Sequence, residues 1–167
     1  MVLVAVLVLA PVSLWAQDAK ADVFGGFSWL SLGGDSSLTA PNRYNPMGWQ
    51  ASVAGHMNNK FSIVGDVGGQ YKDGGKIYEF VGGPRMTHRL DKASVFAHAM
   101  FGGNHVSAGT FSSNGFSMAY GGGVDVTAGE KMAIRVIQFD WAPAHNDGVW
   151  QKNIIRMGFG VVYKIAK

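Results

Sequence analysis

Apolar and polar residues alternate one by one along most of this chain, in segments of about ten residues from residue 22 onward. Residues 49–57 are one example, WQASVAGHM, and residues 116–126 are another, FSMAYGGGVDV. Successive side chains of a β-strand point to opposite faces of its sheet, so a period of two indicates strands. A tilted strand of about 9–11 residues is long enough to cross a bilayer. The pattern therefore predicts a small membrane β-barrel.

Eight segments show this alternation, and the connections between them differ in length. The predicted strands cover residues 22–32, 47–57, 61–71, 77–88, 94–105, 116–127, 132–141 and 151–163. The longer connections follow the odd-numbered strands on average, as in barrels with tight turns on one side and long loops on the other. We therefore predict an all-β fold, an eight-stranded antiparallel up-and-down transmembrane β-barrel. Its long loops would lie at about 33–46, 106–115 and 142–150.

The first residues show a different pattern. Residues 2–10, VLVAVLVLA, form an apolar run that is too short to cross a membrane as a helix. Small residues follow, and the peptide bond after Ala16 or the one after Ala21 is suitable for cleavage by a signal peptidase. We predict a secretory signal peptide over residues 1–21 and a barrel domain over residues 22–167. No later stretch approaches the length of a helical membrane span.

The composition agrees with a barrel and argues against several kinds of site. Charged residues make up only 15% of the chain, whereas about a quarter is usual in soluble domains. The absence of cysteine excludes disulfides, thiolate metal sites and cysteine nucleophiles. The five histidines fall on different predicted strands without the spacing of a metal site. Lysine and arginine are dispersed along the chain, so we expect no nucleic-acid partner. We also expect no metal and no cofactor.

The alternation gives each predicted strand an outer face, with residues such as Val53, and an inner face. The inner faces carry six charged residues, Asp66, Glu79, Arg85, Asp125, Asp140 and Arg156. An eight-stranded barrel is only wide enough for its own side chains, and an unpaired buried charge costs several kcal/mol. We therefore predict that the six residues form a polar network that plugs the interior. In this register Asp140 lies opposite Lys152, and Asp125 lies near Arg135.

Two predicted strands fit the alternation less well than the others. Phe24 and Leu30 in the first strand fall on the predicted inner face, and so do Phe96 and Met100 in the fifth. A β-bulge in each strand would switch these apolar residues to the outer face.

Three stretches carry a family resemblance: residues 78–85, YEFVGGPR; residues 95–103, VFAHAMFGG; and residues 134–141, IRVIQFDW. They resemble the outer-membrane β-barrel domain family, the small porin-like or OmpA-type eight-stranded barrels of Gram-negative bacteria. The resemblance implies a monomer in the outer membrane, in contact with outer-membrane lipid and inserted by the barrel assembly machinery. Barrels of this family end on an aromatic residue, whereas here residues 164–167, KIAK, follow Tyr163.

Three classes of function remain open at this point. The first is a structural or adhesive outer-membrane barrel without enzymatic activity, whose loops make surface contacts. The second is a narrow porin-like channel for small solutes. The third is a lipocalin-like soluble carrier, which hides its apolar face inside. Aromatic residues on the outer face favour a membrane barrel, and an apolar interior favours a carrier.

A remote alternative is catalytic. His105 and Ser107 lie on one face of the fifth predicted strand and resemble the His-Xaa-Ser arrangement of outer-membrane lipid A deacylases. Glu79, on the neighbouring strand, would orient the histidine. The alternation, however, places Glu79 inside the barrel and His105 outside. A polar junction between strand and loop is the preferred interpretation, and we predict no catalytic residue.

Overall fold

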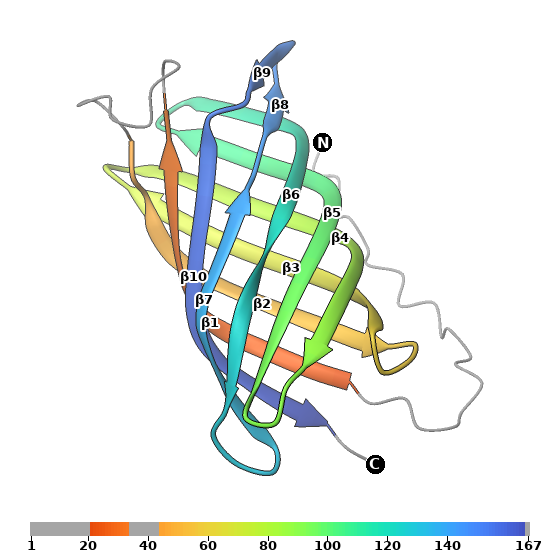
Figure 1. Ribbon diagram of the computed structural model, residues 1–167. Helices are drawn as coiled ribbons and strands as arrows, with labels where there is room; N and C mark the ends of the chain where they lie inside the picture. Colours follow the sequence, from red (N-terminus) through yellow and green to blue (C-terminus); the bar gives the residue numbers. More distant parts are fainter. Residues whose placement is uncertain (1–20, 34–43, 166–167) are drawn as a thin grey trace.

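The computed structural model describes residues 21–33 and 44–165 and forms a closed antiparallel barrel of eight long strands (Figure 1). The strands are β1 (Ala21–Leu32), β2 (Met47–His56), β3 (Phe61–Lys72), β4 (Gly75–Arg89), β5 (Ala93–Ala108), β6 (Phe111–Thr127), β7 (Met132–Trp141) and β10 (Ile154–Ile165). From β1 to β7 each strand pairs with the next along the chain, and β10 pairs with both β7 and β1. The predicted fold class is therefore confirmed.

The two ends of the barrel differ. Ala21 and Ile165 pair with each other at one end, here termed the termini end. The opposite end, termed the hairpin end, carries two further short strands, β8 (Ala144–Asn146) and β9 (Val149–Gln151). These two strands form a hairpin that pairs with Gly115–Ser117 of β6 and extends the wall beyond the barrel (Figure 1).

Most of the predicted signal peptide, residues 1–20, lies outside the described residues, as does most of the predicted loop 33–46. Ala21, the second predicted cleavage point, is the first residue of β1 and pairs with Gly55 of β2. In the described part of the chain, no helix is long and apolar enough to cross a membrane.

The other two predicted loops are largely strands. β5 and β6 extend to a turn at residues 109–110, so the range 106–115 is mainly a hairpin. The range 142–150 contains β8 and the start of β9. Strands that continue past a membrane need no apolar face, so the alternation that marks a membrane strand disappears there. For this reason the sequence pattern at these positions is that of a loop.

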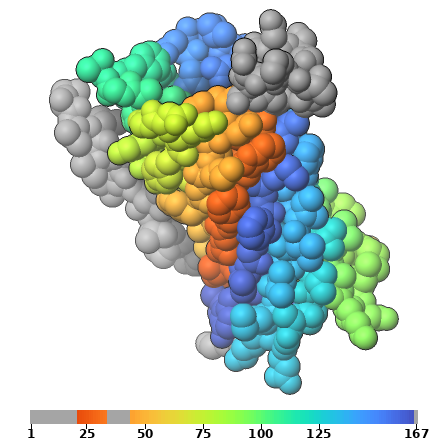
Figure 2. All heavy atoms as spheres, turned by 90° about the vertical axis from the view of Figure 1, so that its left-hand side faces the viewer, coloured from red at the N-terminus to blue at the C-terminus, as the bar shows by residue number. Residues whose placement is uncertain are grey.

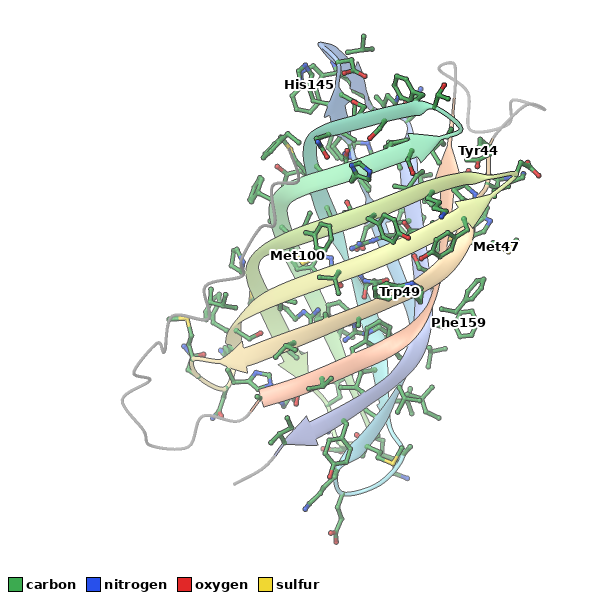
Figure 3. All side chains as sticks on the ribbon, turned by 180° about the vertical axis from the view of Figure 1, so that it is seen from behind. Tyr44, Met47, Trp49, Met100, His145 and Phe159 are labelled. Carbon is green, nitrogen blue, oxygen red and sulfur yellow. The ribbon has the colours of Figure 1, made fainter. Side chains whose placement is uncertain are left out.

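The outer surface of the barrel is apolar. Val53 and Phe159 lie on it with exposed fractions of 55% and 56%, and Met47 and Phe159 project away from the wall (Figure 3). Near the hairpin end, aromatic residues form part of a girdle, in which the Trp49 indole nitrogen lies 3.4 Å from the hydroxyl of Tyr71. Such a surface is typical of a barrel that faces lipid.

The four apolar side chains that interrupt the predicted alternation in β1 and β5 lie inside the barrel, and the predicted bulges are wrong. Phe24, Leu30, Phe96 and Met100 are all buried. The pairing of β1 with both neighbours and of β5 with β6 runs without a break. The barrel interior needs filling at every level, and these side chains occupy the levels that the charged residues leave open.

Two glycines allow the barrel to close. Gly26 of β1 and Gly160 of β10 pair directly at the seam, where β1 and β10 lie side by side (Figure 2). A Cβ atom on Gly26 would lie 2.2 Å from the Phe159 carbonyl oxygen, and one on Gly160 would lie 2.3 Å from the Gly25 carbonyl oxygen. Only glycine permits this approach of the two backbones, which lets the sheet curve tightly.

Candidate functional site

Arg156 of β10 lies at the centre of a buried ion cluster. Its side chain is fully buried, and its Nη1 donates hydrogen bonds to Asp66 at 2.9 Å and to Glu79 at 2.8 Å. Its Nε and Nη2 donate to one carboxylate oxygen of Asp140, at 3.0 and 2.7 Å. These three carboxylates come from β3, β4 and β7. One guanidinium therefore joins three strands to the strand that closes the barrel.

Four other side chains hydrogen-bond to these carboxylates: Gln138 donates to the Asp140 oxygen that Arg156 also binds, and the other three contact the second oxygen of their carboxylate. Gln50 Nε2 lies 2.7 Å from an oxygen of Asp66, and Gln138 Nε2 and His98 Nε2 each lie 2.8 Å from an oxygen of Asp140. The side chains involved are Gln50 for Asp66, Ser117 for Glu79, and Gln138 and His98 for Asp140. Hydrogen bonds of this kind lower the cost of holding charge away from water.

A second ion pair lies next to the cluster. Arg135 of β7 donates through Nε and Nη2 to the two oxygens of Asp125, at 2.8 and 3.1 Å. Its Nη1 donates to Gln138 at 2.8 Å, which links the pair to the cluster. The Arg135 guanidinium also lies 4.2 Å from the ring centre of Phe24 and 4.3 Å from that of Phe96. Aromatic faces thus surround a charge that is almost fully buried.

Arg85 lies inside the barrel but outside this hydrogen-bonded network. Its guanidinium is 4.5 Å from the ring centre of Phe96, on which Arg135 also packs. Within the described residues, its Nε and Nη2 have no hydrogen-bond partner. The Arg85 guanidinium therefore packs on an aromatic ring, and Asp125, Asp66 and Asp140 are near enough to interact with its charge.

The structure thus brings together Asp66, Glu79, Asp140 and Arg156, places Asp125 on Arg135, and leaves Arg85 apart. The predicted position of Asp140 opposite Lys152 is wrong, because Asp140 pairs with Arg156. The hairpin of β8 and β9 takes up the connection, so β10 begins only at Ile154.

Arg135 is the main residue that the sequence pattern missed. With Gln138 and Asp140 inside, strict alternation would place Arg135 on the lipid side. The pairing of β6 with β7 changes register, from Val124 opposite Ile137 to Asp125 opposite Arg135. The extra residue is a bulge in β7, and it turns Arg135 inward. The proximity of Arg135 to Asp125 across the turn was the only available signal.

A small cavity opens at the hairpin end, above the ion cluster. It has a volume of about 30 Å³, and Glu79 and Ser117 are among its lining residues. Asn104 and Asn146 also line it and are joined by a hydrogen bond of 2.7 Å. We term this cavity the cup. Its apolar lining comes from Leu30, Leu32, Ile77, Val106, Ala142, Ala144 and Ile154.

The deacylase arrangement is not formed. Nδ1 of His105 lies 2.7 Å from the side-chain oxygen of Asn114. Glu79 is buried and bound to Ser117 and Arg156 instead. Among the described residues, no group of three or more side chains is arranged to hold a metal ion.

The chain was compared with known proteins. No protein-family model and no curated protein matches its sequence. Solved structures share its fold. Neisserial surface protein A is 11% identical, with 88% of this chain and 97% of that chain covered and a TM-score of 0.66.

Two further solved barrels agree. The N-terminal β-barrel domain of Pseudomonas aeruginosa OprF is 9% identical, with 89% of this chain and all of that chain covered and a TM-score of 0.62. Ail, the attachment invasion locus protein of Yersinia pestis, is 16% identical, with 89% and 100% covered and a TM-score of 0.57. The chain therefore has the fold of the small eight-stranded outer-membrane β-barrels.

Proposed function

We propose that this protein is a closed outer-membrane β-barrel with a structural or adhesive role. The observation that carries the proposal is the position of polar and apolar side chains. Charged residues such as Arg156 and Asp140 fill the interior, and residues such as Val53 and Phe159 cover the outside. A soluble carrier needs the reverse arrangement, so the lipocalin-like alternative is disfavoured. The filled interior likewise disfavours a channel.

The hairpin end is the face that we place toward the cell exterior. In barrels of this kind the longer connections lie on the outer side, and here the two longest, between β1 and β2 and between β7 and β10, both begin at the hairpin end. The walls at the hairpin end expose large apolar side chains that lie beyond the barrel proper: Phe111 at the start of β6, and Val149 and Trp150 of β9. Exposed apolar residues on a projecting wall suit contact with another surface.

The similar fold of Ail supports an adhesive role. Ail is named the attachment invasion locus protein, and one of its structures is a complex with the heparin analogue sucrose octasulfate. We carry over only the kind of role, contact with an external surface, and no ligand. We further propose that the protein is a monomer, inserted by the barrel assembly machinery and surrounded by outer-membrane lipid.

The absence of cysteine permits a direct test of location and orientation. Asp147→Cys places a thiol in the turn between β8 and β9, and Glu130→Cys places one in the turn between β6 and β7. On intact cells, a membrane-impermeant maleimide should label the first variant and not the second. After permeabilisation it should label both.

The same cells should yield the protein in the outer-membrane fraction, and the unheated sample should migrate faster on a gel than the boiled one. Labelling of Glu130→Cys on intact cells, or recovery of the protein in a soluble fraction after a salt wash, would overturn the proposal.

A further inference from the structure

The ion cluster carries more negative than positive charge. Asp66, Glu79 and Asp140 share the single guanidinium of Arg156. His98 adds one hydrogen bond to Asp140, at 2.8 Å. A group of carboxylates in a dry interior is stabilised by any further positive group that can reach it.

Two buried oxygen atoms near the cluster lack a hydrogen-bond partner. Gln50 donates through Nε2 to Asp66, and its Oε1 has no partner among the described residues. Gln70 donates through Nε2 to Ser28, and its Oε1 is also without one. Both glutamines are 1% exposed. Both acceptors belong to the interior that holds the ion cluster, but neither glutamine lines the cup, so of these groups only the Glu79 carboxylate is reached from it.

The cup gives access to this half of the interior. Glu79 belongs both to the ion cluster and to the lining of the cup. The volume of about 30 Å³ is larger than the roughly 10–15 Å³ that one water needs. Leu30, Ile77 and Val106 form part of an apolar wall around the approach to Glu79.

We propose that the cup binds the end of an aliphatic primary amine, with the ammonium group against Glu79. The ammonium supplies three donors and one positive charge next to the Glu79 carboxylate, and the side-chain oxygens of Asn104 and Asn146 lie in the same lining. The methylene groups next to it pack on the apolar wall, and the rest of the ligand extends out of the barrel. This inference depends on the proposed function in one respect: the proposed orientation of the barrel decides the side of the membrane to which the cup opens.

The same observations disfavour a metal ion. Metal cations such as Ca²⁺ take six or more oxygen ligands, whereas most of the cup is lined by carbon. An alkylammonium group needs only a few acceptors and gains from apolar contact along its chain.

The test uses the full barrel refolded in detergent, with n-butylammonium as the probe and n-butanol as its neutral counterpart. The side-chain amides of Asn104 and Asn146 line the cup, and their NMR signals report binding there. In the wild type, n-butylammonium should shift these signals with saturation, and n-butanol should not. Equal shifts with both compounds would show an apolar cavity only and would overturn the proposal, as would the absence of saturation.

Two variants and one control locate the site. Glu79→Gln removes the charge at nearly constant shape and should weaken binding by at least about tenfold, the loss expected for a hydrogen bond to a charged group. Asp22→Asn removes a carboxylate at the termini end, away from the cup, and should bind like the wild type. Ile77→Trp fills the cup without changing its charge and should abolish binding, even if Glu79→Gln does not fold.

Unchanged affinity in Glu79→Gln or in Ile77→Trp would contradict the proposal. Because binding is measured in detergent, a failure here leaves the location and orientation of the barrel untouched. Those are decided separately by the cysteine labelling.

Discussion

At Arg156, three carboxylates share one guanidinium inside the barrel. Removal of the guanidinium would leave Asp66, Glu79 and Asp140 without their common partner. Removing one partner of a buried ion pair destabilises a protein by about 3–5 kcal/mol, because the remaining charge stays buried without a partner.

We therefore expect Arg156→Met to lower the free energy of unfolding by about 3–5 kcal/mol. Urea unfolding of the refolded protein in detergent, followed by tryptophan fluorescence, measures the change. Arg89→Met is the matched control, since Arg89 is exposed and donates to the Asn59 carbonyl, and it should cost less than about 1 kcal/mol. Equal stability of Arg156→Met and the wild type would contradict the structural role of the cluster.

Alternation alone places Asp66, Glu79 and Arg156 inside the barrel, because a strand without bulges keeps its two faces apart. It does not place Arg135, since a bulge in β7 reverses the faces between Arg135 and Gln138. Alternation also does not predict that Arg85 packs on Phe96, because it indicates which face of a strand a side chain lies on and not which residue that side chain contacts.

At the scale of strands, β1 and β10 depend on glycine where they meet. Gly26 and Gly25 are neighbours in β1 with opposite surroundings. A Cβ on Gly26 would meet the backbone of β10, whereas one on Gly25 would have no atom within 4 Å.

We expect Gly26→Ala to destabilise the barrel by about 1–3 kcal/mol, because β1 and β10 would have to move apart. Gly25→Ala should leave the stability within about 0.5 kcal/mol of the wild type. The temperature at which the compact band disappears on a gel compares the two variants directly. A larger loss of stability in Gly25→Ala than in Gly26→Ala would show that the close approach of the β1 and β10 backbones at Gly26 does not determine the stability of the seam.

The outer face of β2 permits a second test. Val53 lies midway between Trp49 and Met57 along this face, and 55% of its surface is exposed. In a membrane, Val53→Arg should cost about 2–4 kcal/mol, and Met57→Arg, just beyond the end of the strand, about 0–1 kcal/mol. Unfolding in phospholipid vesicles measures both. Similar costs at the two positions would argue against a membrane around β2.

The strands themselves were largely predictable, because each lipid-facing stretch must alternate. β7 has the predicted bounds, and β2 differs by one residue. The pattern failed in the outer part of β5 and β6 and in β8 and β9, where the wall no longer has lipid on one side. Backbone hydrogen bonds pair those strands, and such bonds do not require an alternating pattern of apolar residues in the sequence.

At the scale of the whole molecule, the filled interior predicts that the barrel does not conduct. Arg156, Asp140 and Gln138 are each at most 1% exposed, so no continuous column of water passes between them. Planar-bilayer recording of the refolded protein should show no stable current steps. Stable ohmic steps that change in Arg156→Ala would instead establish a narrow pore.

The ion cluster also bears on the order in which the barrel is assembled. Arg156 follows Asp66 by 90 residues and Glu79 by 77, and it arrives with the last strand. Until β10 is in place, these carboxylates lack the Arg156 guanidinium, although Arg85 of β4 and Arg135 of β7 belong to the same interior. The closing strand therefore delivers the central counter-charge and the last row of backbone pairing together. A barrel without β10 would hold the three carboxylates without their common partner.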